Sequence, residues 1–262
     1  MPRLPRRLKR TASAVLAVAA LVFGTASAAA DGSDDQSAAG QPPWTRSIVC
    51  PVLYTHEVPN QAIFRRFLLG LLAAGYQPDS LATVDAAMSG TTDTPRGCIV
   101  LTFDDGLLSQ YLNALPVLTD LGVPAVFFVL PGFGDGVHRY MGIAELQAIS
   151  SAGEEVELHT CNHANLPLLA RRNMGAFSAE LEDCRHILAD ITGQPVDYLA
   201  YPYGAFDATV LDAVTRFGFR AAFTTRASAL LAYGSPYTLP RIRYDPGEPL
   251  AAILRRIRAA GG

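Results

Sequence analysis

The feature that most constrains the fold is an alternation of short apolar runs with helix-like segments. Strand-length runs are expected near residues 48–54, 98–103, 124–129, 155–159, 198–201, 220–224 and 239–243. Helical patterns are expected at 60–74, 81–88, 109–121, 143–151, 173–192, 207–217 and 249–260. Strands separated by helices pair in parallel, because the crossover between them needs a helix. The sequence therefore predicts an α/β fold of parallel βα units.

Two adjacent carboxylates, Asp104 and Asp105, follow the run at 98–103. The carboxyl ends of parallel strands face the loops that carry catalytic groups. Neighbouring residues on a regular strand point to opposite faces, but Gly106 permits a sharp turn that brings both carboxylates to one site. Such a pair suits divided labour, in which one carboxylate binds a metal and the other takes a proton. The alternative is that one aspartate caps the next helix.

Two histidines four residues apart, His159 and His163, stand at the end of the expected strand at 155–159 and just beyond it. Together with Asp105 they offer three metal ligands and leave positions open for water and substrate, which is the pattern of catalytic zinc. The alternative is a pair of ordinary loop histidines. Glu155 and Glu157 share a strand face with His159, so one of them is a candidate to orient an imidazole. Otherwise that end of the strand is solvated.

A third segment, Tyr201-Pro202-Tyr203-Gly204, closes the run at 198–201. Together with Thr102-Phe103-Asp104-Asp105-Gly106 and His159-Thr160-x-x-His163, it resembles the first three motifs of the polysaccharide deacetylase family, carbohydrate esterase family four. The resemblance extends over about residues 48–244. It implies an α/β fold, a distorted (β/α)7 barrel of the polysaccharide deacetylase type, with one divalent metal, most often Zn²⁺.

The resemblance also implies a role for each matching residue. Asp105, His159 and His163 would hold the metal, and Asp104 would be the general base. The metal and the backbone N–H of Tyr203 would stabilise the oxyanion. The implied activity is a secreted metal-dependent hydrolase that removes N-acetyl groups from poly-N-acetylglucosamine, peptidoglycan or a chitin-like polysaccharide by attack of a metal-bound water.

The sequence departs from the common family pattern at two places. Many members have an arginine where Ala200 stands, and a histidine near the C-terminus that acts as general acid, whereas no histidine follows His186 here. These departures leave two alternatives open. One is a catalytically impaired relative that binds glycan, and the other is an O-acetyl xylan esterase that uses the same groups.

Replacements for both groups are found in the pattern of the poly-N-acetylglucosamine deacetylase branch. That branch has a Tyr-His at the end of its first strand as the acid, and His56 stands there with one residue, Thr55, intervening. It also has a Leu-Pro-Arg near its end, which predicts that Arg241 or Arg243 stands beside Asp104 and keeps it ionised. Arg241 thus joins Tyr203 as a candidate oxyanion or substrate-site residue. The alternatives are a strand-end histidine bonded to backbone and an arginine that covers the barrel rim.

The N-terminal segment has the layout of an export signal. Residues 1–30 combine a basic start, an apolar stretch and small residues before a cleavage site, and residues 31–46 have the composition of a flexible linker. The catalytic domain would then be 47–262. The expected location is extracellular, cell-wall-associated or periplasmic, with no membrane span once the signal is removed.

Charge and cysteine content agree with an exported enzyme. Five of the 21 basic residues lie in the signal, so that the remainder, with 24 acidic residues, has a net charge of −8. This charge disfavours nucleic acid as a partner and is compatible with an acetylated polysaccharide. We expect a monomer. Four cysteines allow three pairings, of which Cys50–Cys98 and Cys161–Cys184 are expected. Alternatively, Cys161 is an extra metal ligand.

Overall fold

The computed structural model describes residues 44–133 and 139–262. The predicted export signal and residues 31–43 of the predicted linker lie outside the described residues. The last three residues of that linker pack on the domain. The indole N–H of Trp44 donates to Asp85, and the side chain of Arg46 donates to the carbonyl of Ala87.

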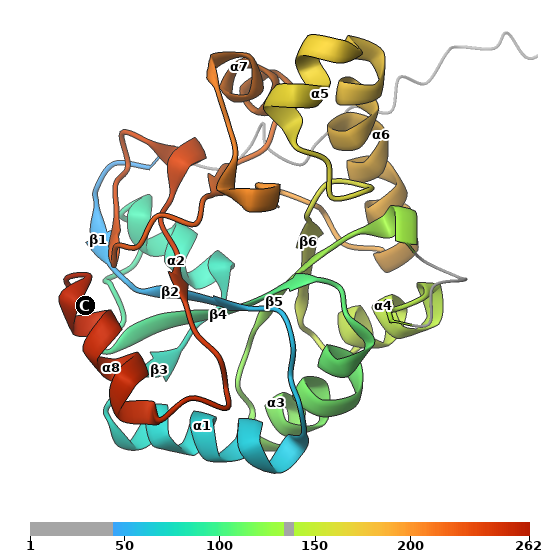
Figure 1. Ribbon diagram of the computed structural model, residues 1–262. Coiled ribbons are helices and arrows are strands. Elements are labelled where there is room, and N and C mark those ends of the chain that lie inside the picture. The colour runs from blue at the N-terminus through green and yellow to red at the C-terminus, as the bar shows by residue number, and fades with distance from the viewer. Residues whose placement is uncertain (1–43, 134–138) are drawn as a thin grey trace, which may run out of the picture. The chain divides into compact units, whose positions relative to one another are not determined.

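Parallel strands form the centre of the fold (Figure 1). Their spatial order is β10 (Ile242–Arg243), β2 (Val52–Thr55), β4 (Cys98–Asp105), β5 (Val126–Val129), β6 (Glu155–Leu158), β7 (Tyr198–Ala200) and β8 (Ala221–Phe223). The short strand β3 (Gln77–Pro78) pairs with the start of β4. Neighbouring strands are consecutive in the chain from β4 to β8, as expected of βα units.

The segment just before and within β10 closes the sheet. Leu239 forms a parallel bridge with Phe223 of β8, and three residues later Ile242 lies opposite Leu53 of β2. The same segment therefore lies against both edges of the sheet. This confirms the predicted distorted (β/α)7 barrel.

Most helices match the sequence prediction to within a residue or two. They are α1 (Gln61–Ala73), α2 (Leu81–Met88), α4 (Ile143–Ser151), α6 (Met174–Thr192), α7 (Ala208–Arg216) and α8 (Leu250–Ala259). Helix α3 (Leu115–Leu121) ends where predicted but begins six residues after the predicted start at 109. Asn60, Ser80, Asn173 and Asp207 are side-chain N-caps, which explains why four of these starts are sharp.

Several elements were not predicted. Helix α5 (Leu166–Arg172) is short and contains a proline in its first turn, where the ring is tolerated. The predicted helix at 109–121 begins with a π-helical turn, η1 (Gln110–Ala114). The predicted strand at 48–54 breaks at Cys50 and Pro51. Its first part, β1 (Ile48–Val49), pairs antiparallel with β9 (Leu230–Leu231). Within the described residues there are also the 3-10 turns η2 (Pro131–Phe133), η3 (Pro202–Gly204) and η4 (Pro236–Thr238).

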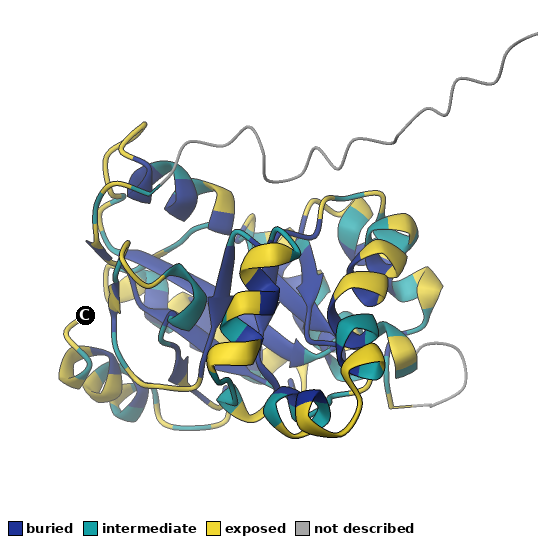
Figure 2. Cartoon of the chain, turned by 90° about the horizontal axis from the view of Figure 1, so that it is seen from above, coloured by how far each residue is buried: buried dark blue, intermediate teal, exposed yellow. Residues whose placement is uncertain are grey.

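The alternation of side chains along β4 determines what faces the barrel interior. Ile99, Leu101 and Phe103 belong to the outer core, between the sheet and the helices. Cys98 and Val100 belong to a second core with interior residues of β5, β7 and β8. Continuing the period of two carries Thr102 and Asp104 to the interior. Figure 2 shows the central strands buried and the outer faces of several helices exposed.

Two disulfides link elements that are distant in sequence. Cys50 is bonded to Cys98 at the start of β4, and Cys161 is bonded to Cys184 of α6. Both predicted pairings are confirmed, and the alternative of Cys161 as a metal ligand is wrong because its sulfur is in a disulfide. Across residues 44–133 and 139–262, no helix combines the length and apolar character that a bilayer crossing requires.

Candidate active site

The candidate site lies at the carboxyl end of β4. Asp105 has φ 74° and Gly106 has φ 68°, so the backbone turns through two successive left-handed residues directly after Asp104. Left-handed φ is unfavourable for a residue with a side chain, which makes Asp105 a locally strained position. The turn was predicted to depend on Gly106, but it begins one residue earlier, at Asp105. Neither aspartate caps the helix that follows, since η1 has no side-chain cap.

Asp105, His159 and His163 come together as one cluster. Asp105 Oδ1 is 3.6 Å from His159 Nε2 and 3.5 Å from His163 Nε2. The ligand atoms of all three residues lie within 4.8 Å of one another. Asp105 Oδ1 is buried and has no hydrogen-bond partner. An orphaned carboxylate oxygen beside two imidazole nitrogens is a donor set that fits a divalent transition metal.

The imidazole of His159 is oriented by a backbone carbonyl. Its Nδ1 lies 2.6 Å from the carbonyl oxygen of Ala200 on β7. A carbonyl oxygen only accepts, so Nδ1 carries the proton and the lone pair of Nε2 faces Asp105. Burial lowers the pKa of His159 to about 4. The ring is therefore neutral at neutral pH, which is the form that binds metals.

The expectation that Glu155 or Glu157 orients an imidazole is wrong. Glu157 accepts from the backbone N–H groups of Asp197 and Tyr198, at the beginning of β7. Glu155 accepts from Leu81 and Ala82, at the start of α2. Both carboxylates therefore bind backbone N–H groups at the amino end of the barrel, away from the histidines. The group that does orient His159 is a main-chain carbonyl, for which a sequence carries no side-chain signal.

Asp104 is paired with Arg241 inside the barrel. Arg241 Nη1 donates to Asp104 Oδ1 at 2.7 Å and Nη2 donates to Oδ2 at 2.8 Å. Burial alone would raise the pKa of Asp104, but the Arg241 guanidinium, with His159, outweighs it and holds that pKa below its ordinary value. Asp104 is therefore ionised. Arg243, the other sequence candidate, lies two residues later in β10 and is exposed.

The guanidinium of Arg241 is fixed on all sides. It is 0% exposed, its Nε donates to the carbonyl of Thr224, and Nη1 also donates to Thr102 Oγ1. The ring of Tyr54 lies 4.6 Å from the guanidinium carbon, and that of Phe128 lies 5.4 Å away. Aromatic faces stabilise a buried cation of this kind. The arginine is thus a fixed part of the interior rather than a cover for the rim.

His56 lies just beyond β2, next to the strand that carries Asp104. It is close enough for its charge to act on the pKa of Asp104. Its backbone carbonyl accepts from Gln110 Nε2, which also donates to the carbonyl of Asp104 at 2.6 Å. Gln110, fully buried in the π-helical turn, thus joins the ends of β2 and β4. The sequence reading missed Gln110, because a glutamine in a helical pattern is usually exposed.

Tyr203 lies beside the second histidine. Its φ of 61° turns the backbone within η3, and its ring centroid is 4.6 Å from that of His163. The side chain is 65% exposed. An aromatic ring that is held against a candidate ligand and open to solvent on its other side can contact a bound molecule.

Comparisons with known proteins agree with this geometry. The sequence profile of the polysaccharide deacetylase family matches residues 91–222. The Bacillus subtilis protein YxkH, named as a polysaccharide deacetylase, is 27% identical over 206 residues, which are 75% of this chain and 72% of YxkH. The Escherichia coli K12 poly-β-1,6-N-acetyl-D-glucosamine N-deacetylase is 31% identical over 105 residues, 36% of this chain and only 16% of that enzyme.

The fold also matches a solved structure. The Streptococcus pyogenes deacetylase PplD, solved in complex with acetate, superposes with a TM-score of 0.72 at 22% identity, over 81% of this chain and 99% of PplD. At that identity the likeness establishes the fold. The profile match covers all three motifs, and those motifs meet at one end of the barrel. This chain belongs to the polysaccharide deacetylase family.

Proposed function

We propose that this protein is an exported metal-dependent hydrolase that removes N-acetyl groups from a polysaccharide, with poly-β-1,6-N-acetyl-D-glucosamine as the first candidate substrate. The observation that carries the proposal is the placement of two groups at one end of the barrel. The cluster Asp105, His159 and His163 is suited to a metal, and the buried pair Asp104–Arg241 keeps a carboxylate ionised beside it. Two disulfides support an oxidising compartment.

Asp105, His159 and His163 are the residues that would hold the metal, and zinc is the ion that best suits them. When bound, such an ion acts as a Lewis acid that polarises the acetyl carbonyl and lowers the pKa of water. Asp104 accepts the proton of the attacking water, and Arg241 keeps both of its oxygens in place. The backbone N–H of Tyr203 donates to the oxygen that gains charge. The carbon–nitrogen bond breaks, and His56 supplies the proton that the leaving amine needs.

The substrate class is supported by charge as well as by relatives. The E. coli relative is named for poly-β-1,6-N-acetyl-D-glucosamine, although the match covers a small part of it. Without the predicted signal, this chain has a net charge of −8, counted over its 24 acidic residues and the basic residues that remain. Deacetylation turns a neutral glycan into a cationic one. An acidic protein tolerates such a product, whereas it would repel an anionic polymer.

The test is acetate release by the purified protein from a panel of substrates. Oligomers of β-1,6-N-acetylglucosamine, peptidoglycan fragments, chitin oligomers and acetylxylan are compared, each before and after chelation and after zinc is added back. We expect release from an N-acetylated substrate that stops on chelation, returns with zinc and is lost in Asp104→Asn. Release from acetylxylan alone would make the protein an esterase. Glycan binding without any acetate release would overturn the enzymatic proposal.

A further inference from the structure

The loop that joins the two histidine ligands adopts a backbone that its own sequence does not favour. Thr160 has φ 65° and His163 has φ 56°, and neither is a glycine. Left-handed φ costs energy for residues with a side chain, so surrounding structure must impose it. Within the loop, Thr160 Oγ1 accepts from the backbone N–H of Ala164 at 3.2 Å. The other polar contacts of this loop come from elsewhere in the chain.

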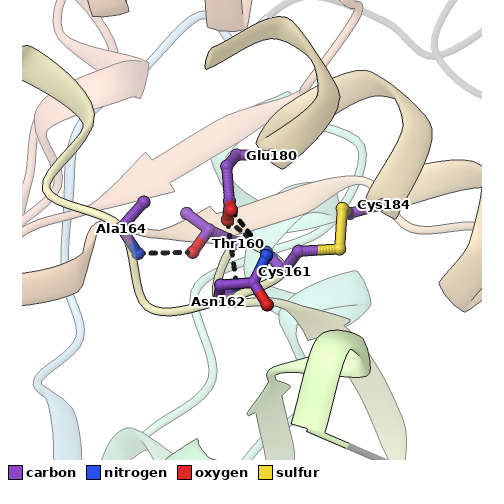
Figure 3. Close-up of a disulfide and its surroundings, with 6 residues drawn as sticks. All are labelled: Thr160, Cys161, Asn162, Ala164, Glu180 and Cys184. Carbon is purple, nitrogen blue, oxygen red and sulfur yellow. Dashed lines mark hydrogen bonds between the residues drawn. A yellow bond between two sulfur atoms is a disulfide. The ribbon is translucent and has the colours of Figure 1, made fainter. Parts of the chain in front are cut away.

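One helix supplies most of them through a single carboxylate. Glu180 Oε2, on α6, accepts from the backbone N–H of Cys161 at 2.8 Å and from that of Asn162 at 2.9 Å. Its other oxygen, Oε1, accepts from Asn162 Nδ2 at 2.7 Å. Figure 3 shows the carboxylate directed at this loop. All three groups are N–H donors, so the position calls for a side chain that only accepts.

The same helix makes a covalent link to the same loop. Cys184 lies four residues after Glu180 on α6, and its sulfur is bonded to Cys161 (Figure 3). Residues four apart lie on one face of a helix. Phe177, Leu181 and Leu188 anchor α6 in the outer core. The helix is thus a rigid platform, and two of its side chains hold the loop.

The opposite side of the loop is also confined. The backbone N–H of Gly132, in η2, donates to the carbonyl of Cys161 at 3.0 Å. A Cβ at Gly132 would lie 2.5 Å from Asn162 Oδ1 and 2.6 Å from the carbonyl oxygen of Cys161. A glycine is therefore required for this close approach. Held on both sides, the loop has little freedom to relax.

We infer that Glu180 is a positioning residue for the metal site. Its carboxylate, helped by the disulfide, holds Cys161 and Asn162 in the conformation in which His159 and His163 both face Asp105. Glu180 touches neither the candidate ligands nor the substrate site, and it is buried at 8% exposure. The inference rests on the proposed metal binding. It adds a residue outside the three family motifs that determines how tightly the metal is bound.

The test measures zinc affinity rather than turnover, by competition with a chromophoric chelator. Glu180→Ala removes both acceptor oxygens, whereas Glu180→Gln keeps one neutral oxygen and replaces the other with a donating NH2 group. Bonds to the remaining oxygen are weaker, since bonds to a charged acceptor are about twice as strong. We expect the affinity to fall about tenfold to hundredfold in Glu180→Ala, and by less in Glu180→Gln. Glu182→Ala, an exposed glutamate on the same helix, is the matched control and should bind zinc like the wild type.

A second readout does not depend on the metal. In zinc-free protein, the amide protons of Cys161 and Asn162 should exchange with solvent faster in Glu180→Ala than in the wild type, because they lose their acceptor. If Glu180→Ala fails to fold, as judged by circular dichroism, Glu180→Gln decides. Wild-type zinc affinity in the folded Glu180 variants would overturn the positioning role and leave the deacetylase proposal standing. Absence of zinc binding by the wild type would overturn both.

Discussion

Arg241 and Asp104, separated by 137 residues, form a two-point ion pair in the barrel interior, with N–O distances of 2.7 and 2.8 Å. Many members of the family carry an arginine where this chain has Ala200, on β7. Here the guanidinium comes from the segment that closes the barrel between β8 and β2. The same carboxylate can thus be kept ionised from a different strand, because interior side chains of all strands converge at one end.

Replacing the arginine tests this pair. In Arg241→Met the pKa of Asp104 should rise, since burial then acts without the guanidinium, and the acid limb of kcat/KM should move to higher pH by more than one unit. The free energy of unfolding should fall by about 3–5 kcal/mol, because a buried charge is left unpaired. Arg243→Met, at an exposed position two residues later in β10, is the control. An unchanged acid limb in Arg241→Met would dissociate this arginine from the ionisation of Asp104.

The metal cluster makes a stoichiometric prediction. Wild-type protein dialysed against zinc should retain about one ion per chain, as expected of a single three-ligand site. Asp105→Ala and His163→Ala should retain none at the same free zinc concentration, as measured by inductively coupled plasma mass spectrometry. His186→Ala, at an exposed position on α6, should bind like the wild type. Full retention by Asp105→Ala would show that the ion binds elsewhere.

The assignment of the general acid is tested at His56. Gln110 is bonded to the backbone carbonyl of His56 and not to its ring, so His56→Ala leaves that connection in place. We expect kcat to fall about 100-fold to 10,000-fold, with zinc content unchanged. Wild-type turnover in His56→Ala would eliminate this histidine as the acid.

The elements that could be predicted from the sequence are those marked by periodic apolar residues and by helix-capping residues. The strands and the longer helices fall where the runs and cap residues place them. The convergence of the candidate metal ligands was predictable for a related reason. Asp105 ends strand β4, His159 and His163 follow strand β6, and parallel strands bring their carboxyl ends to one edge. The Leu-Pro-Arg pattern also indicated Arg241 or Arg243 as the partner of Asp104, but only the structure shows that the partner is Arg241.

What the sequence did not reveal lies in contacts made by buried polar groups and backbone. The carbonyl of Ala200 orients His159, yet nothing distinguishes that alanine from any other strand residue. Gln110 and Glu180 occupy helical segments in which polar residues normally face solvent, and only the packing of η1 and α6 turns them inward. Glu157 was assigned to the wrong partner because strand alternation gives the face but not the height within the barrel.

The amino end of the barrel gives a last prediction, on stability. Glu154 is buried and accepts from the backbone N–H of Ala125 at 2.7 Å. Burial is the largest cause that raises its pKa to about 7, and nearby Glu155 adds to the effect. A carboxyl that holds its proton more tightly when folded than when unfolded favours the folded state at low pH. That contribution is complete below the unfolded value of 4.5 and is lost as pH rises through about 7.

Glu154→Gln should therefore remove a pH dependence while keeping the fold, because the amide oxygen of glutamine still accepts from Ala125. We expect the free energy of unfolding of the wild type, measured with urea in zinc-free protein, to fall relative to that of the variant between pH 4.5 and pH 7. The full difference is about 3 kcal/mol at most, from the size of the pKa shift. Glu182→Gln, exposed on α6, should follow the wild type at every pH. Parallel curves for wild type and Glu154→Gln would mean that Glu154 is already ionised at mildly acidic pH in the folded protein.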